Sequence, residues 1–385
     1  MTTLLSMINL LQNKLSVLAE GDPSAQLIQQ LITEGRLHHK ETWAGHMTPA
    51  VDQAALLGQL LAGLHNGNLL SAELYPQLAI IERQLLDWFC QLFQQPFAHF
   101  THGSSYGNID ALWQARERTK NSSNMVYGSQ AAHYSISKAC RILGLNFQAI
   151  PTDELGQMDV NALRIACELT PPRAIVVTAG TSSCGAIDPI STCIDIAIEF
   201  KSWCHVDAAW GGALMLSPAH QHQLTGMGQA DSVCVDPHKA LGQPKPCSLL
   251  LYKQPLTSSL DIDVDYLTHT PKQSISGSYG GELFLPLWCS LILNGKQSFS
   301  DRIDQRLEQA ELFALALRQY TNWWLLHSAT GIVCFKPSTE IDLTHLINLG
   351  QLSKAKVNGQ EIYRVVFASH TSQAKPLLAA LALYF

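Results

Sequence analysis

Short apolar runs alternate with helical patterns between residues 97 and 252, and this alternation constrains the fold more than any other feature. The clearest run, at residues 174–178, is apolar on both faces, as is typical of a buried parallel strand. Strands are expected at residues 97–101, 124–128, 147–150, 174–178, 204–207, 232–235 and 248–252, and intervening helices at 108–118, 135–143, 159–168 and 190–200. The pattern predicts an α/β fold with a mainly parallel seven-stranded sheet covered on both faces. Ligands in such sheets bind at the carboxyl ends of the strands.

The chain divides into three expected regions. Residues 1–75 form a helical segment, because apolar side chains recur every three or four positions from Leu4 to Leu18. Residues 76–300 form the large α/β domain, and residues 301–385 form a small C-terminal α+β domain. Other helices are expected at 23–35, 56–64, 78–93, 283–294, 301–320, near Thr344 and after Lys375, other strands at 331–336 and 362–367, and a long loop at 257–278.

Composition excludes several classes of protein. The 385 residues carry a formal net charge of −6 without a basic stripe, which argues against binding to nucleic acid. No apolar run reaches the roughly 18 residues that span a bilayer, and the N-terminus lacks the features of a signal peptide. The ten cysteines are scattered without a Cys-x-x-Cys pair. We therefore expect a cytoplasmic protein with cysteines in its core and no metal site.

A carboxylate and a lysine follow two of the expected strands. Asp207 ends the strand at residues 204–207, and Lys239 follows the strand at 232–235. Pyridoxal 5'-phosphate (PLP) needs this pair, because the lysine amine forms a Schiff base with the cofactor aldehyde and the carboxylate keeps the pyridine nitrogen protonated. Ala209 is small, as is needed where a ring lies flat on a strand end.

Three further strand ends carry side chains that suit the same cofactor. The turn at residues 101–108 is rich in glycine and hydroxyl groups, and Ser104 and Ser105 are candidates to bind a phosphate at a helix start. His133 precedes the next helix, where its imidazole can stack on a pyridine ring. The loop at 179–189 can supply hydroxyl donors to the cofactor or to a substrate carboxylate. Together these features predict a PLP site.

These residues resemble the PLP-dependent group II amino-acid decarboxylases, a family that includes aspartate, glutamate, diaminobutyrate, histidine and aromatic-amino-acid decarboxylases. The specific matches lie at residues 205–212, 230–232 and 236–239. Weaker matches lie at residues 45–48, 78–88, 104–105, 132–135, 180–182, 276–278 and 363–366. The resemblance covers residues 42–385. It implies the type I, aspartate-aminotransferase-like fold of PLP enzymes and a homodimer with shared active sites.

The resemblance also implies roles for individual residues. Lys239 attaches the cofactor, Asp207 pairs with the pyridinium, and His133 stacks on the ring. The implied cofactor-binding set is Ser104, Ser105, His133, Ser182, Asp207, Ala209, His238, Lys239 and Ser278. Ser278 belongs to a turn that in relatives often reaches the phosphate of the partner subunit.

On the substrate side, four more residues are candidates. His46 lies in a motif that resembles the family's substrate-side entry motif. An acidic substrate side chain needs a cationic partner, for which Arg364 and Lys245 are the alternatives. Tyr266 lies in the segment where relatives carry a loop tyrosine that protonates the substrate carbon. His133 is the alternative proton donor.

We therefore expect an enzyme that removes the α-carboxylate of an L-amino acid, with aspartate or glutamate as the favoured substrate. Diaminobutyrate, histidine and aromatic amino acids remain alternatives, as do oxidative decarboxylation, transamination and carbon–sulfur cleavage. Tyr279 stands where an arginine usually follows the serine at position 278, and the loop at 261–276 is short. These departures keep open a PLP-binding relative with altered or lost catalysis. An α/β binding module without PLP is the remaining alternative.

Overall fold

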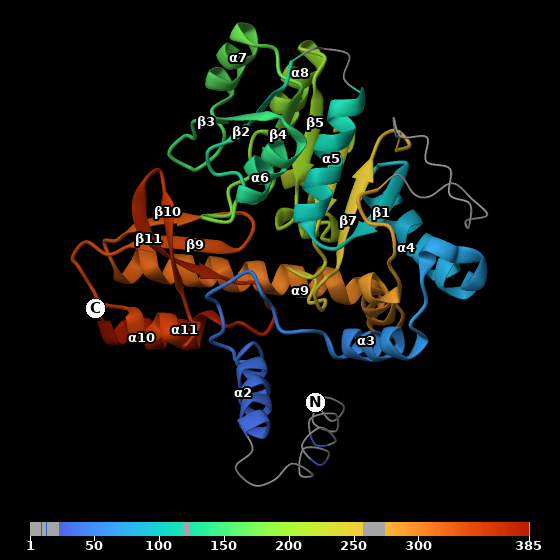
Figure 1. The fold of residues 1–385 in the computed structure, drawn as a ribbon. Helices are drawn as coiled ribbons and strands as arrows, with labels where there is room; N and C mark the ends of the chain where they lie inside the picture. Colours follow the sequence, from blue (N-terminus) through green and yellow to red (C-terminus); the bar gives the residue numbers. More distant parts are fainter. Residues whose placement is uncertain (1–8, 10–12, 14–22, 119–122, 257–273, 385) are drawn as a thin grey trace.

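The computed structural model describes residues 9, 13, 23–118, 123–256 and 274–384. The helix expected from Leu4 to Leu18 and the side chain of Tyr266 therefore lie outside the described residues. Figure 1 shows a large sheet with helices packed around it, a long helix α9 beneath it, and a smaller sheet on one end of α9.

The large sheet contains seven strands in the order β1-β7-β6-β5-β4-β2-β3. Their bounds are β1 Phe97–Thr101, β2 Met125–Ser129, β3 Asn146–Ile150, β4 Ala174–Thr178, β5 Trp203–Asp207, β6 Ser232–Val235 and β7 Ser248–Tyr252. Only β7 pairs antiparallel with its neighbours, β1 and β6. The other neighbouring strands pair in parallel. The predicted mainly parallel sheet is confirmed.

Both faces of the large sheet are covered by helices. The helices that follow its strands are α5 Ser104–Arg118, α6 Tyr134–Leu143, α7 Val160–Leu169 and α8 Ile190–Glu199. All five residues of β4 are buried. Ile175 and Val177 pack into the cluster that includes α8, whereas Ala174 and Val176 pack into the cluster formed with α5 and α6. Because alternate side chains of a strand point to opposite faces, this double burial explains the unbroken apolar run of β4.

The small sheet has the order β10-β11-β9-β8, and all of its pairings are antiparallel. Its elements are β8 Trp324–His327, β9 Ile332–Lys336, α10 Thr344–Asn348, β10 Ser353–Val357, β11 Gln360–Val366 and α11 Ala374–Leu381. The two central strands, β9 and β11, were predicted, and the two edge strands, β8 and β10, were not. In β10 the exposed Lys354 and Lys356 alternate with less polar residues, so no apolar run marks the strand.

Helix α9 (Leu285–Tyr320) connects the large and small sheets. The two helices expected at 283–294 and 301–320 form this single element, in which Gly295 is the residue with non-helical angles (φ 76°, ψ 160°). The expected domain boundary at residue 300 therefore lies inside α9.

The N-terminal helices are α2 Pro23–Leu37, α3 Gln53–His65 and α4 Pro76–Phe93. Helix α3 packs along α9, where Asn294 Nδ2 and Arg302 Nη1 donate to Asp52, the residue that caps α3, over 2.7 and 2.6 Å. The described residues also contain six short 3₁₀ helices: η1 Leu69–Leu74, η2 Gly211–Leu216, η3 Gln221–Leu224, η4 Met227–Gln229, η5 Gly281–Leu283 and η6 Ala382–Tyr384. The part of the chain that the structure describes contains no helix long and apolar enough to cross a membrane.

The cysteines are core residues, as the sequence predicted. All ten are free thiols, and nine of them are buried. Burial raises the pKa of Cys140 and of Cys167 to about 12, so these thiols are protonated and unreactive at neutral pH.

Candidate active site

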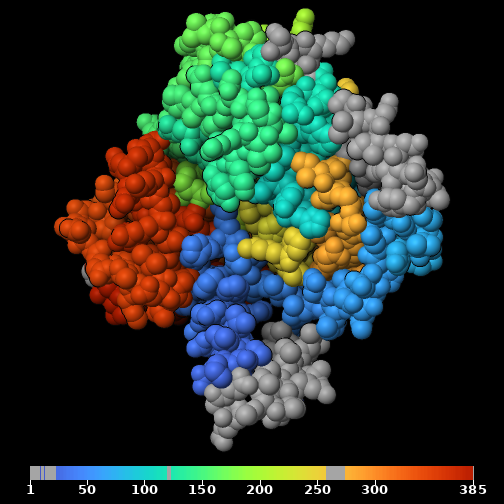
Figure 2. Space-filling model, viewed as in Figure 1, coloured from blue at the N-terminus to red at the C-terminus, as the bar shows by residue number. Residues whose placement is uncertain are grey.

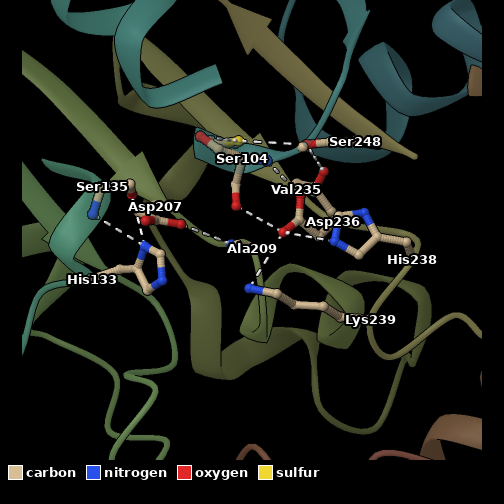
Figure 3. Close-up of polar contacts among 12 residues, drawn as sticks. Ser104, His133, Ser135, Asp207, Ala209, Val235, Asp236, His238, Lys239 and Ser248 are labelled. Carbon is tan, nitrogen blue, oxygen red and sulfur yellow. Dashed lines mark hydrogen bonds and ion pairs between the residues drawn. The ribbon is translucent and has the colours of Figure 1, made fainter. Parts of the chain in front are cut away.

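A small cavity opens at the carboxyl ends of β4, β5 and β6, beside the first turns of α5 and α6. It is lined by Ser104, His133, Thr178, Gly180, Ser182, Asp207, Ala209, Trp210 and Lys239. Six of these residues were predicted as site residues from the sequence. Figure 3 shows His133 beside Asp207 on one side, Lys239 beneath Asp236 on the other, and Ala209 between them.

Asp207 is held by two donors. Asn108 Nδ2 donates to its Oδ2 over 3.0 Å, and the backbone N–H of Ala209 donates to its Oδ1 over 3.2 Å. The side chain is buried, and among the described residues no cation forms an ion pair with it. A buried carboxylate without a cationic partner is unusual and suits a cationic ligand such as a pyridinium.

A chain of hydrogen bonds fixes Asn108 behind Asp207. His205 Nε2 lies 2.8 Å from Asn108 Oδ1, and His205 Nδ1 lies 2.9 Å from Ser232 Oγ. Trp203 Nε1 donates to the same Ser232 oxygen over 2.9 Å. Burial lowers the pKa of His205 to about 4, so its ring is neutral. The Ser232 hydroxyl therefore donates to Nδ1, Nε2–H donates to Asn108, and the amide NH₂ of Asn108 faces Asp207.

His133 caps the N-terminus of α6. Its Nδ1 accepts from the backbone N–H of Ser135 over 3.3 Å and lies 2.8 Å from Ser135 Oγ, which in turn accepts from Asn108 over 2.9 Å. Burial lowers the pKa of His133 and outweighs the opposing effect of Asp207. The ring is therefore neutral at neutral pH, with its Nδ1 lone pair engaged by α6, which leaves its face free for stacking.

Lys239 follows β6 in a turn whose other polar members are Asp236 and His238. Lys239 Nζ lies 3.3 Å from Asp236 Oδ2, and its side chain is 20% exposed. His238 Nδ1 lies 2.7 Å from the carbonyl oxygen of Cys247, which directs Nε2 towards Asp236 at 3.6 Å. The lysine amine is thus held at the cavity by a carboxylate.

The hydroxyl side chains expected to bind phosphate lie at the start of α5. The helix begins at Ser104 and not at Asn108 as predicted, so Ser104 and Ser105 belong to its first turn. Ser104 donates to Asp236 twice, from its backbone N–H over 3.1 Å and from its hydroxyl over 2.8 Å. The N-terminus of a 15-residue helix, a serine hydroxyl and His238 form a donor set suited to phosphate.

Two glycines allow the loops around the cavity to meet. A Cβ atom on Gly211 would lie 2.4 Å from the carbonyl oxygen of Ala179, and one on Gly180, which has φ 103°, would lie 3.0 Å from the nitrogen of Gly211. Gly211 N donates to Ala179 O over 2.9 Å. The loops after β4 and β5 therefore touch through their backbones, and this contact fixes Ala209 and Trp210 at the cavity.

The cavity fits PLP on observations of its own residues. The Thr178 hydroxyl is buried, lines the cavity and has no hydrogen-bond partner among the described residues. An unsatisfied buried hydroxyl in a native site indicates a missing polar partner, which a bound cofactor supplies. Asp207 would face the pyridine nitrogen, His133 the ring, Lys239 the aldehyde, and Ser104 with His238 the phosphate. Only Lys239 among these can provide the attaching amine.

A second group of predicted residues lies outside this cavity. His46 is exposed at the surface. The pKa of its imidazole is lowered, mainly by the partial burial of the ring and to a smaller extent by the positive charges of Arg364 and Lys245. Arg364 lies on β11, and its Nε donates to Ser353 Oγ over 2.9 Å. In Figure 2 the blue segment after α2, the yellow segment before β7 and the red small domain meet on one face. Arg364 and Lys245 both act electrostatically on His46, so both lie near it, outside the cavity.

Ser278 does not join the cavity of its own chain. It is exposed, and its hydroxyl accepts from Asn68 Nδ2 over 3.3 Å. The neighbouring Tyr279 is buried and donates to Glu82 over 2.7 Å. Burial and, to a smaller extent, the charge of Glu82 raise the pKa of Tyr279. Its hydroxyl therefore stays protonated and donates to Glu82 inside the core.

A larger hollow of about 940 Å³ adjoins the cavity and shares His133 and Ser182 with it. Its wall is completed by the loop after β3 with Asp153 and Glu154, and by the β10–β11 hairpin with Lys356. The hollow lies between the large sheet and the small sheet. A molecule bound next to His133 would extend into it.

The predictions missed Asn108, His205 and Thr178 as parts of the site. Asn108 lies one helical turn after Ser104, and Thr178 is the last residue of β4, so both positions carried a signal. His205 lies two residues before Asp207 and therefore on the same face of β5. A periodicity argument would have placed it beneath the carboxylate.

Comparison with known proteins gives a consistent family. The sequence profile of the pyridoxal-dependent decarboxylase conserved domain matches residues 17–338. The aspartate 1-decarboxylase of Aliivibrio fischeri is 28% identical over 358 residues, covering 80% of this chain and 65% of that protein. The L-2,4-diaminobutyrate decarboxylase of Rhizobium meliloti is 36% identical over 235 residues, covering 56% and 47%. The chain thus spans less than two thirds of the length of either relative.

Solved structures share the fold at low sequence identity. A crystal structure of Oryza sativa TDC with PLP and tryptamine gives a TM-score of 0.85 at 20% identity, covering 99% of this chain and 96% of that one. Mouse CSAD in its apo form gives a TM-score of 0.80 at 22% identity, covering 97% and 90%. The predicted type I fold of PLP enzymes is confirmed.

Proposed function

The chain belongs to the pyridoxal-dependent decarboxylase family, whose cofactor is PLP, and from that premise we propose that it removes the α-carboxylate of an L-amino acid as CO₂ and releases an amine. One observation carries the proposal: Asp207, His133 and Lys239 come from three different elements and line one cavity. The residues that PLP chemistry requires are thus present together.

Each side chain has a distinct task in this reaction. Bound PLP supplies the sink for the electrons released when CO₂ leaves. Asp207 would hold a proton at the pyridine nitrogen, and Asn108 keeps the carboxylate oriented for that task. His133 would cover the ring, and its capping bonds to Ser135 hold the imidazole in place. Lys239 would supply the attaching amine, and its partial exposure would let a substrate reach it.

We propose an acidic amino acid, aspartate or glutamate, as the substrate. Arg364 and Lys245 both act electrostatically on His46 and place positive charge beside it. Arg364 lies near Cys184, which borders the hollow next to His133. Among the described residues no carboxylate forms an ion pair with Arg364. A second carboxylate on the substrate would supply its missing partner.

A diaminobutyrate substrate is the second candidate. Asp153 and Glu154 line the hollow beside His133 and would suit a cationic side chain. The 36% identity to the diaminobutyrate decarboxylase of Rhizobium meliloti supports the same alternative. Neither Asp153 nor Glu154 lines the cavity that holds Lys239. The wall of the hollow also contains Lys356, so it carries charges of both signs.

Incubation with single amino acids tests the function and the substrate together. The PLP-loaded protein should convert aspartate or glutamate into the matching amine with release of CO₂. Lys239→Ala should abolish turnover and prevent borohydride from attaching the cofactor, whereas Lys138→Ala, on the exposed face of α6, should do neither. Full turnover by Lys239→Ala would refute the assignment. Aldehyde and peroxide in place of amine would indicate the oxidative reaction, and a PLP band that no amino acid perturbs would indicate lost catalysis.

A homodimer is proposed as the working form. Helix α3 and the adjoining half of α9 expose large apolar side chains, including Leu60 (49%), Leu64 (85%) and Leu293 (59%). Such a patch suits a second copy of the chain. The double variant Leu60→Glu/Leu64→Glu should give monomers in size-exclusion chromatography with light scattering, and Leu169→Glu, on exposed α7, should not. A monomeric wild-type protein would contradict the proposal.

A further inference from the structure

Asp236 lies where the cofactor phosphate is expected. Its side chain is 1% exposed, and its Oδ2 contacts the Ser104 hydroxyl at 2.8 Å, Lys239 Nζ at 3.3 Å and His238 Nε2 at 3.6 Å. Its Oδ1 accepts from the backbone N–H of Ser104, at the N-terminus of α5. Figure 3 shows the carboxylate between Ser104, His238 and Lys239. The donors assigned to a phosphate thus already serve a carboxylate of the chain.

The surroundings of Asp236 favour its ionised form. Burial alone favours the neutral acid, but Lys239 and then His238 hold the pKa of Asp236 below its usual range. The hydroxyls of Ser104 and Ser248 act in the same direction. The other titratable groups that interact with Asp236 are His133 from α6, Cys234 from β6 and Cys247 before β7. Burial lowers the pKa of His133 and of His238 and raises the pKa of both thiols, so none of these four groups supplies a full positive charge at neutral pH, and Lys239 is the main cause of the lowered pKa of Asp236.

A phosphate held by Ser104 and His238 would bring a second anion against this carboxylate. Phosphate monoesters have a second pKa near 6, so PLP carries a dianionic phosphate in water above about pH 7. Two like charges in contact disfavour each other strongly in a buried site. Lys239 does not resolve the conflict, because its nitrogen is the atom that attaches the cofactor. Asp236 cannot leave easily, since it is buried and bonded to the backbone of α5.

We propose that PLP binds with the uptake of one proton from solvent, which Asp236 and the cofactor phosphate share. This inference rests on the proposed PLP site and adds a property of this chain to it: Asp236 makes the affinity for the cofactor fall as the pH rises. When two oxyanions share a proton, repulsion becomes a hydrogen bond. By linkage, binding that takes up one proton weakens about tenfold per pH unit above the pKa values of the free groups.

Titration of the cofactor-free protein with PLP and with pyridoxal tests the proposal. Pyridoxal has the same aldehyde and lacks the phosphate, so effects of pH on Lys239 appear with both ligands and cancel in the ratio of their dissociation constants. For the wild-type protein this ratio, PLP over pyridoxal, should rise about tenfold per pH unit between pH 7 and 9. For Asp236→Asn the ratio should stay nearly constant over this pH range. At pH 9 the variant should bind PLP at least tenfold more tightly than the wild-type protein does. Asp87→Asn, on the exposed face of α4, controls for net charge and should behave as the wild type.

A second measurement needs no variant. Isothermal titration calorimetry of the wild-type protein with PLP at pH 8, in buffers of different ionisation enthalpy, should report the uptake of about one proton more than with pyridoxal. Equal proton uptake for the two ligands, or weaker PLP binding by Asp236→Asn at every pH, would overturn the proposal. Failure of PLP to bind to the wild type at all would instead refute the PLP site itself, so the two failures are distinguishable.

Discussion

Asn108 Nδ2 lies 3.0 Å from Asp207 Oδ2, and the carbonyl oxygen of the same amide lies 2.8 Å from His205 Nε2. The neutral His205 can only donate to that oxygen, so the amide cannot turn its acceptor towards Asp207. Helix α5 and strand β5 thereby fix the orientation of the carboxylate across 99 positions of sequence. The orientation of the expected pyridinium partner therefore depends on a residue that does not itself line the cavity.

Replacing Asn108 by alanine should weaken PLP binding about tenfold to a hundredfold. A hydrogen bond to a charged group contributes about 1.5–3 kcal/mol, and here its loss also frees Asp207 to turn away. Fluorescence titration with PLP measures the effect, and the variant should remain folded by circular dichroism. Asn161→Ala, at an exposed position of α7, is the matched control and should bind normally. Unchanged PLP affinity in Asn108→Ala would show that Asp207 needs no orienting partner.

His205 should make the folded protein sensitive to acid. Burial lowers its pKa from 6.5 to about 4 in the folded chain, so the unfolded chain takes up the proton first as the pH falls. The contribution of the neutral ring to stability is complete above pH 6.5 and is lost as the pH falls towards 4, by about 3 kcal/mol in full.

Urea unfolding of wild type and His205→Gln between pH 7 and 4.5 measures this contribution. Glutamine can still donate to Asn108 but does not titrate, so the variant should lose less stability over this pH range. His222→Gln, at an exposed position of η3, should follow the wild type. Parallel pH profiles for wild type and His205→Gln would contradict the assigned burial effect.

The sequence predicted the large sheet because four of its strands, β4 to β7, are buried along their whole length. β1, β4, β6 and β7 begin and end where their apolar runs do. The edge strands β8 and β10 were missed. β10 alternates exposed lysines with less polar residues, and β8 has four residues of which none is fully buried, so neither carries the signal of a buried strand. The start of α5 was placed late because the Ser104-Ser105-Tyr106-Gly107 segment reads as a turn, and only the contact of Ser104 with Asp236 shows why a helix begins there.

For the site, the sequence predicted the residues that carry chemistry and missed those that orient them. Lys239, Asp207 and His133 are residue types with recognised roles in PLP chemistry, so their positions after strands identified them as candidates. Asn108 and His205 are unremarkable polar residues until the topology brings them together from positions 97 apart. Ser278 lies away from the cavity of its own chain, so its assigned contact with a phosphate in the partner subunit stays a prediction.

Gly211→Ala should destabilise the protein by about 1–3 kcal/mol, because the new Cβ atom would lie 2.4 Å from a backbone oxygen that cannot move without disrupting the loop after β4. PLP affinity should fall as well, since Ala209 and Trp210 would shift. Gly35→Ala in α2 is the matched control. Nothing lies within 4 Å of its Cβ position, so it should stabilise the helix by up to about 1 kcal/mol. Equal unfolding midpoints for the two variants would contradict the close contact of the loops.

Arg364→Gln should separate the two candidate substrates. If Arg364 pairs with the side-chain carboxylate of an acidic substrate, the variant should raise KM for aspartate or glutamate at least tenfold and leave PLP affinity unchanged, because the guanidinium lies outside the cofactor cavity. The KM for diaminobutyrate, tested in parallel, should not rise. Arg318→Gln, at an exposed position of α9, should alter neither value. An equal rise for both substrates would instead assign Arg364 to the α-carboxylate that all amino acids share, and Lys245 would then remain as the candidate cation for the side-chain pocket.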